Sequence, residues 1–166
     1  MKLLTLASLL CLVATTGFAT AADLPSAGDD LAVYAGKYPF DVIGGYSFLE
    51  NQKVVEAGDS AAGPGTADWI ADLDVGTPIA LQEDGLIAAL CEAHNCAGNN
   101  AAFAISLAGR LIAVCLFSKD GEVGVVPGQA HWIGLNLDRY LDPAQGGGGC
   151  PRDAEEFLEA YARALH

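Results

Sequence analysis

The short segment Cys91-Glu92-Ala93-His94-Asn95-Cys96 holds the residue types best suited to chemistry in this chain. Two thiols flank an imidazole, and the whole sequence has only three histidines. Thiolates and imidazoles bind zinc, paired cysteines form disulfides, and an imidazole can donate or accept hydrogen bonds. His94 is therefore a metal ligand, a redox accessory, a group presented to another molecule, or merely an exposed side chain in a polar loop.

Known catalytic motifs are not found in the sequence. It has no Gly-x-Ser-x-Gly elbow, no His-Glu-x-x-His helix, no phosphate-binding glycine loop and no Cys-x-x-Cys redox pair. Asp68, Asp72 and Asp74 do not follow the spacing of a calcium loop, so we expect them to form a solvated acidic face. The sequence thus predicts a protein that is not an enzyme and that needs no cofactor.

A zinc site is the main alternative for the cysteine segment. Cys91, His94 and Cys96 would bind the metal, with His131 or Cys115 as the fourth ligand. Structural zinc ligands are usually closer together in sequence, and thiolates in an exported chain tend to oxidise first. Disulfides are therefore favoured over a metal.

The first 21 residues have the pattern of a secretory signal peptide. Lys2 precedes an apolar run from Leu3 to Phe18, and small residues follow up to Ala21. We expect residues 1–21 to be removed during export to the periplasm. Residues 22–166 would then form a single domain, in which residues 22–37 are a loosely ordered leading segment.

The mature chain would keep four cysteines and a strong negative charge. In an oxidising compartment four cysteines favour disulfides, for which three pairings exist. The short spacing favours Cys91–Cys96, which leaves Cys115–Cys150. Without residues 1–21 the chain has 7 Lys and Arg against 21 Asp and Glu, a net charge of −14. This charge argues against nucleic-acid binding and favours a basic partner.

Apolar runs and turn signals predict an α+β fold with a central antiparallel sheet of about five strands. Three dipeptides, Asp84-Gly85, Ala108-Gly109 and Asp120-Gly121, each separate two short apolar runs. The expected strands lie near residues 77–82, 86–91, 100–107, 110–117 and 122–126. The central strands are apolar on both faces, so helices or a partner subunit should cover both sides. The cysteine segment would then project from the end of the sheet between the second and third strands.

Helices are predicted before and after these strands. Ser47 and Glu50 have capping-box spacing at the start of a helix over residues 47–57, and residues 58–65 should form a loop. Thr66 can cap a short helix with Trp69, Ile70 and Leu73 on one face. The last helix starts at a capping box of Asp153 and Glu156. Before this helix, we expect residues 131–141 to pack on the sheet through Trp132, Ile133 and Leu137. The glycine run 145–149 should be a flexible hinge. In the last helix, Phe157, Tyr161 and Leu165 should face the rest of the domain.

The segment from Cys91 to Cys96 resembles the signature loop of the Ivy family, the inhibitors of vertebrate lysozyme. The family loop reads Cys-Lys-Pro-His-Asp-Cys. Residues 66–70, TADWI, resemble the family's Pro-Ala-Trp-Val segment, residues 99–126 resemble its following strands, and HWIG at 131–134 matches a later tryptophan. The resemblance covers roughly residues 38–140 and rests on the loop, the strand pattern and the export signal together.

The resemblance implies a fold, a partner and a role for each loop residue. Ivy proteins are periplasmic proteins of Gram-negative bacteria that inhibit c-type lysozymes, and some form homodimers. Their loop enters the active-site cleft, where its histidine bonds to the two catalytic carboxyl groups. By this resemblance His94 is the key residue, and Cys91 and Cys96 hold its loop. The alternative is an Ivy-like protein that no longer inhibits lysozyme and binds another periplasmic or cell-wall partner.

Three loop positions depart from the family pattern. Glu92 replaces lysine and brings a negative charge toward an acidic enzyme centre. Ala93 replaces proline, so the loop loses a φ constraint and should be less preorganised. Asn95 replaces aspartate and removes a carboxylate that could orient the imidazole. These changes bear on potency and target choice rather than on the fold.

Overall fold

The computed structural model describes residues 30–83, 85–141 and 149–166. The expected signal peptide at residues 1–21, Asp84 of the first turn signal and most of the glycine run lie outside these ranges. The elements are η1 (Leu31–Tyr34), α1 (Gln52–Ala62), α2 (Thr66–Ala71), β1 (Val75–Gly76), β2 (Ala80–Gln82), β3 (Gly85–Cys91), β4 (Asn99–Ser106), β5 (Leu111–Ser118), η2 (Glu122–Gly124), β6 (Ala130–Gly134), β7 (Leu137–Leu141) and α3 (Ala154–Ala164).

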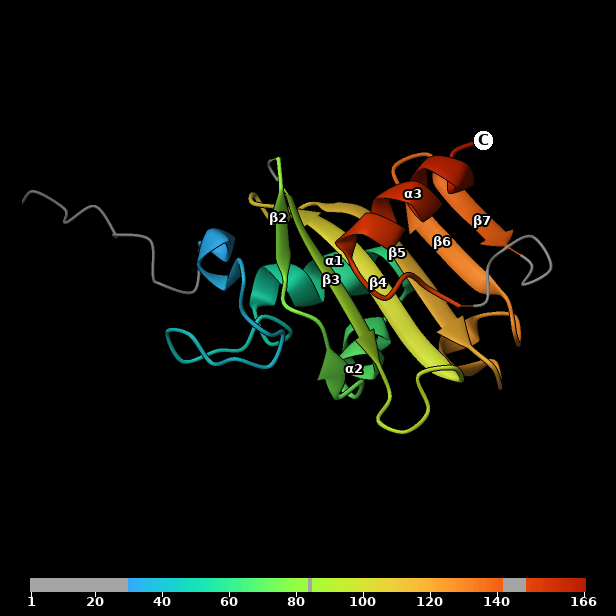
Figure 1. Cartoon of the computed structure of the whole chain (residues 1–166), viewed down its shortest axis with the longest axis horizontal. Helices are drawn as coiled ribbons and strands as arrows, with labels where there is room; N and C mark the ends of the chain where they lie inside the picture. Colours follow the sequence, from blue (N-terminus) through green and yellow to red (C-terminus); the bar gives the residue numbers. More distant parts are fainter. Residues whose placement is uncertain (1–29, 84, 142–148) are drawn as a thin grey trace, which may run out of the picture.

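All strands join one antiparallel sheet, and the fold is α+β as the sequence predicts. The order is β1-β3-β4-β5-β6-β7, with β2 pairing to β3 beside β1. Figure 1 shows α3 in front of this sheet, while α1 and α2 lie behind it. The sheet has seven strands rather than about five because β1 precedes the expected first strand and residues 130–141 form a β-hairpin, whereas the expected strand at residues 122–126 is not formed.

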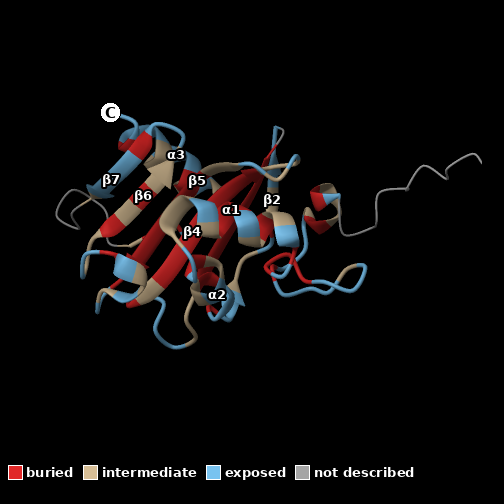
Figure 2. Ribbon diagram, turned by 180° about the vertical axis from the view of Figure 1, so that it is seen from behind, coloured by how far each residue is buried: buried red, intermediate tan, exposed pale blue. Residues whose placement is uncertain are grey.

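Helices cover both faces of the sheet, which explains why the central strands are apolar on both sides. On one face, α1, α2 and the N-terminal segment pack over side chains such as Leu86, Phe103 and Leu116. Figure 2 shows these buried strands behind α1 and α2. On the other face, α3 packs Phe157 against Trp132, with ring centroids 5.3 Å apart. This second face is rich in alanine, which lets α3 approach the strands closely.

The three central strand predictions are confirmed to within one residue at each end, the first is confirmed only over β2, and the fifth is wrong. Residues 77–82 are not one strand, because Pro78 has no N–H to donate and lies between β1 and β2. Residues 122–126 are not a strand either. Gly121, Val123 and Gly124 all have positive φ angles, which turns the chain into η2 instead of extending it.

The first two helices begin at different caps from those expected. Ser47 and Glu50 do form the reciprocal hydrogen bonds of a capping box, but in the turn before α1, and the bonds from Ser47 lower the pKa of Glu50. The helix itself is capped by Asn51 and continues through residues 58–62, which were expected to be loop. Gly65 is the N-cap of α2, and Thr66 instead donates its hydroxyl to the Gly63 carbonyl at 2.8 Å.

The C-terminal expectations are partly confirmed. Asp153 accepts a hydrogen bond from the Glu156 N–H and caps α3 as predicted. Hydrogen bonds from the side chain and backbone of Arg152 hold the pKa of Glu156 below its usual range. Phe157 is buried, but Leu165 is half exposed because it lies at the C-cap, beyond the packed part of the helix.

The described part of the leading segment is packed rather than loose. Leu31 and Tyr34, both in η1, are fully buried against the α1 side of the sheet, because the chain pairs its Gly36 N–H with the Ile79 carbonyl. Residues 22–29 lie outside the described ranges. None of the helices in those ranges has the length and apolar character that crossing a membrane requires.

Candidate functional site

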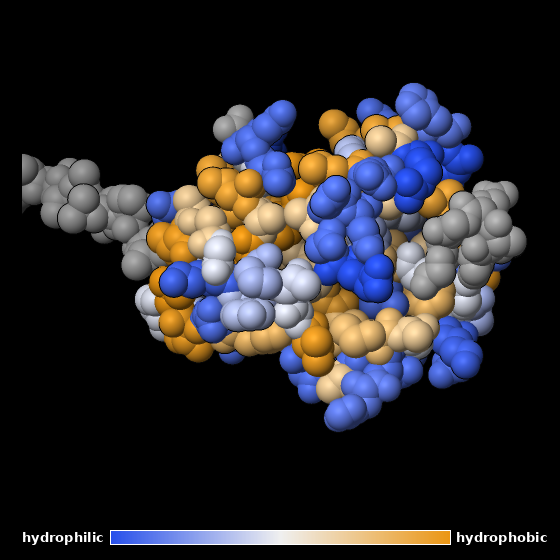
Figure 3. Space-filling model, viewed as in Figure 1, coloured by the Kyte–Doolittle hydropathy of each residue, from blue (hydrophilic) through white to orange (hydrophobic). Residues whose placement is uncertain are grey.

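The cysteine segment forms the loop that connects the neighbouring strands β3 and β4 and extends beyond their ends. Cys91 is the last residue of β3 and pairs with Asn100 of β4. The base of the loop is closed by a hydrogen bond from the Glu92 N–H to the Asn99 carbonyl, 3.0 Å. Figure 1 shows the loop extending past the sheet, and Figure 3 shows mostly hydrophilic side chains covering this end of the molecule.

A disulfide between Cys91 and Cys96 closes the loop, with their Cα atoms 4.7 Å apart. The second disulfide joins Cys115 of β5 to Cys150. Both sequence-based pairings are therefore confirmed. In the part of the chain that the structure describes, Cys91, Cys96, Cys115 and Cys150 are all bonded in pairs, and His131 pairs with Asp138 at 2.8 Å.

His94 lies at the tip of this loop in a left-handed backbone conformation, with φ of 61°. Ala93 and His94 are the central residues of a β-turn that is closed by a bond from the Asn95 N–H to the Glu92 carbonyl, 3.0 Å. The His94 side chain is exposed. Within the described part of the chain it has no hydrogen-bond partner, so the fold presents the imidazole without using either nitrogen.

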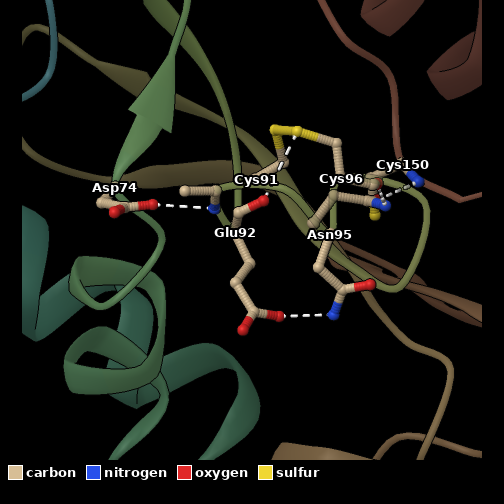
Figure 4. The surroundings of a disulfide bond; sticks show 8 residues. Asp74, Cys91, Glu92, Asn95, Cys96 and Cys150 are labelled. Atoms are coloured by element: carbon tan, nitrogen blue, oxygen red, sulfur yellow. Dashed lines mark hydrogen bonds between the residues drawn. A yellow bond between two sulfur atoms is a disulfide. The ribbon is translucent and has the colours of Figure 1, made fainter.

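Glu92 and Asn95, two of the three departures from the family loop, contact each other. The Asn95 side-chain N–H donates to the Glu92 carboxylate at 2.6 Å (Figure 4), and Asn99 donates to the same oxygen at 2.9 Å. The Glu92 charge is thus hydrogen-bonded inside the loop. Two of the three departures therefore form a hydrogen-bonded pair with each other in this chain.

Asp74 braces the third departure, Ala93, from outside the loop. Its carboxylate accepts a hydrogen bond from the Ala93 N–H at 2.8 Å (Figure 4). A proline at this position has no N–H and could not make this bond. Asp74 was expected on a solvated acidic face; its contact with the loop depends on the pairing of β1 with β3, which the sequence does not reveal.

Trp69 and Glu122 are linked to the loop through Asn99. The sequence did not predict them as part of the site. The Trp69 indole N–H donates to the Glu122 carboxylate at 2.9 Å, and the Asn99 amide donates to the same oxygen at 3.2 Å. Asn99 therefore links Glu122 to Glu92. Trp69 and Glu122 are 53 residues apart in sequence, so only the fold brings them together.

Asn100 connects the loop to the second disulfide. Its buried amide donates to the Cys96 carbonyl at 2.7 Å and accepts from the Cys150 N–H at 2.6 Å. The loop is therefore attached to the body at Asp74, at Glu122 and at Cys150. Such an arrangement holds a small protrusion in one shape, which favours binding to another molecule over chemistry within the loop.

The comparison with protein families agrees with this geometry. The family described as "Inhibitor of vertebrate lysozyme (Ivy)" matches residues 53–162, about two thirds of the chain. The matched range includes the whole cysteine loop, α2 with Trp69, and all of the sheet. No curated protein and no solved structure matches the chain. The match to the family nevertheless spans most of the folded domain, and the chain belongs to the Ivy family of lysozyme inhibitors.

Proposed function

We propose that this protein inhibits a c-type lysozyme by inserting the Cys91–Cys96 loop into the enzyme's active-site cleft. The observation that carries the proposal is the exposed, unpaired His94 at the tip of a braced, disulfide-closed loop. Family membership supplies the class of target, an enzyme that cleaves cell-wall glycan. Inhibition would be reversible and non-covalent, because both loop cysteines are bonded to each other and His94 would form only hydrogen bonds with the enzyme.

His94 would act by bonding to the two catalytic carboxyl groups of the enzyme. In a retaining glycosidase these groups lie about 5 Å apart, on either side of the bond to be cleaved. An imidazole between them has one nitrogen for each, and both can donate when the ring is protonated. The ring would block the sugar site and engage the general acid at the same time.

The negative charge of Glu92 is compatible with this position. Its carboxylate already accepts hydrogen bonds from Asn95 and Asn99. Such bonds spread the charge and fix its direction within the loop. The chain as a whole has a net charge of −13, which would attract a basic lysozyme and offset local repulsion at the loop.

We also propose that the protein acts in the periplasm after removal of residues 1–21. Support comes from the apolar run of that segment and from the two disulfides, which form and persist in oxidising compartments.

The test is a lysis assay with the purified, oxidised chain from residue 22. Hen egg-white or human lysozyme clears a suspension of bacterial cell walls, and we expect stoichiometric amounts of the protein to stop the clearing. No inhibition at a large molar excess over several c-type lysozymes would overturn the proposal. That result would favour an Ivy-like protein whose changes at Glu92, Ala93 and Asn95 redirect the loop to another periplasmic or cell-wall partner.

A further inference from the structure

We infer that Asp74 is a positioning residue for the inhibitory loop: its carboxylate sets the direction in which the turn presents His94. The inference rests on the proposed function, since it concerns how the loop meets lysozyme. It is carried by the hydrogen bond from the Ala93 N–H to Asp74 Oδ1, 2.8 Å long, and by the place of that bond in the turn.

The turn alone does not fix its own direction relative to the sheet. The peptide unit between residues 92 and 93 has two polar groups, the Glu92 carbonyl and the Ala93 N–H. The carbonyl accepts from the Asn95 N–H, a bond within the turn itself. The N–H donates to Asp74, which lies outside the loop. The first peptide unit of the turn is thus held at both ends, and only the bond to Asp74 ties it to another part of the fold.

The sheet determines where Asp74 can reach. Val75 of β1 pairs with Cys91 at the end of β3, so the residue before Val75 lies beside the first residues of the loop. Figure 4 shows Asp74, which directly precedes β1, on one side of Glu92 and Asn95 on the other. The disulfide and the Glu92–Asn95 bond close the loop upon itself, whereas Asp74 holds the first peptide unit of its turn from outside the loop.

Asp74 has no comparable role in the core. Its side chain is exposed, and among the described residues its only hydrogen-bond partner is the Ala93 N–H, with no ion pair. Loss of the carboxylate should therefore change the loop and leave the packing of the sheet intact. This separates a positioning role from a general contribution to stability.

The first experiment compares inhibition constants of the mature, oxidised protein carrying single substitutions. Asp74→Ala removes the acceptor and should weaken inhibition by about five- to tenfold, the effect of one hydrogen bond to a charged group at an exposed site. Asp74→Asn keeps an acceptor oxygen and should restore most of the affinity. Asp72→Ala is the matched control, because it removes the same charge two residues away from an exposed position and should leave inhibition unchanged.

The second experiment tests whether Asp74 acts through the Ala93 N–H. Ala93 is the second residue of the turn, where proline is favoured, and its φ is not positive. Ala93→Pro removes the N–H and presets φ. In that background Asp74→Ala should cause no further loss of inhibition. An equal loss in both backgrounds would show that Asp74 acts by its charge or by another contact, and would overturn the inference.

The third experiment examines the loop without lysozyme. Amide hydrogen exchange of Ala93, followed by NMR, should be slowed in the wild-type protein and accelerated in Asp74→Ala, with unchanged exchange in β3 and β4. If the wild-type protein inhibits no lysozyme, the proposed function fails, but this measurement still tests whether Asp74 holds the Ala93 N–H. Unchanged exchange at Ala93 contradicts the positioning role in either case, and so does unchanged inhibition in Asp74→Ala when the wild-type protein inhibits lysozyme.

Discussion

The His94 side chain depends on an unusual backbone conformation at its own position. Its φ of 61° lies in the left-handed region, where histidine, asparagine and aspartate are found more often than most residues other than glycine. The choice of residue at this position therefore affects both the group that is presented and the stability of the left-handed backbone conformation. Replacement by alanine would remove the imidazole and also strain the turn, so the two effects need separate variants.

We predict that His94→Asn and His94→Ala both weaken lysozyme inhibition, by about 2 kcal/mol or roughly 30-fold. A hydrogen-bonded side chain lost from a closed cleft leaves its partners unsatisfied. His94→Asn tolerates the left-handed conformation and should keep the thermal stability and the loop's NMR shifts. Inhibition constants and melting curves of both variants check this. An unchanged inhibition constant in His94→Asn would show that the imidazole is not the inhibitory group.

The Glu92–Asn95 pair allows a second prediction at the level of single residues. Asn95→Asp places a second carboxylate against Glu92, whose present partner is only 2.6 Å away, and should weaken inhibition by about tenfold. Glu92→Lys alone removes the acceptor that Asn95 and Asn99 use and should also weaken it. The double variant restores an oppositely polar pair and should regain most of the loss. A double-mutant cycle of inhibition constants measures this, and strictly additive losses would argue against direct coupling.

At the level of secondary structure, prediction succeeded where one signal was decisive. The three central strands are long apolar runs between turns, and their buried positions leave no other placement. The start of α1 was misplaced because two cap signals lie close together, and Asn51 rather than Ser47 bonds to the first turn of the helix. The turn at residues 121–124 contains Val123 with φ of 45°, a conformation that its residue type does not indicate.

The loop residues of the candidate site could be predicted from the sequence, but the residues that hold the loop in place could not. The cysteine spacing and His94 are local in sequence, so they can be recognised before the fold is known. Asp74 directly precedes β1, Trp69 lies in α2 and Glu122 in η2. Only the strand pairing and the course of the chain after β5 bring them to the loop. Polar contacts between distant exposed residues leave no periodic pattern in the sequence.

The two disulfides should contribute differently to stability and to inhibition. Cys115–Cys150 spans 35 residues and connects β5 to the start of α3, so its removal should cost about 4 kcal/mol of unfolding free energy. Cys91–Cys96 spans 5 residues and should contribute about 2 kcal/mol. Inhibition should show the opposite order, because only the shorter bridge shapes the loop.

Paired cysteine-to-alanine variants at each bridge, compared by urea denaturation and by inhibition constants, test this prediction. The same variant being worst in both measurements would mean that the loop disulfide is a general stabilising link. A loss of inhibition without a comparable loss of stability at Cys91 and Cys96 supports its role in shaping the loop.

For the molecule as a whole, the excess of acidic residues should act on the rate of encounter with lysozyme. A net charge of −13 attracts a basic enzyme over distances of about 10 Å at 0.1 M salt. We predict that the association rate constant falls by about tenfold or more between 50 mM and 500 mM NaCl, with little change in the dissociation rate constant. Surface plasmon resonance at several salt concentrations measures both, and a salt-independent association rate would exclude steering.

The two edges of the sheet have a further consequence for a chain in which 52% of the residues are hydrophobic. Unpaired strand edges can add strands from other molecules and begin aggregation. On one side the edge is divided into β1 and β2, each too short to template a new strand, with Pro78 between them. On the other side β7 exposes Asp138 and Arg139. The same divided edge that positions Asp74 thus also guards the sheet against edge-to-edge aggregation at high local concentration.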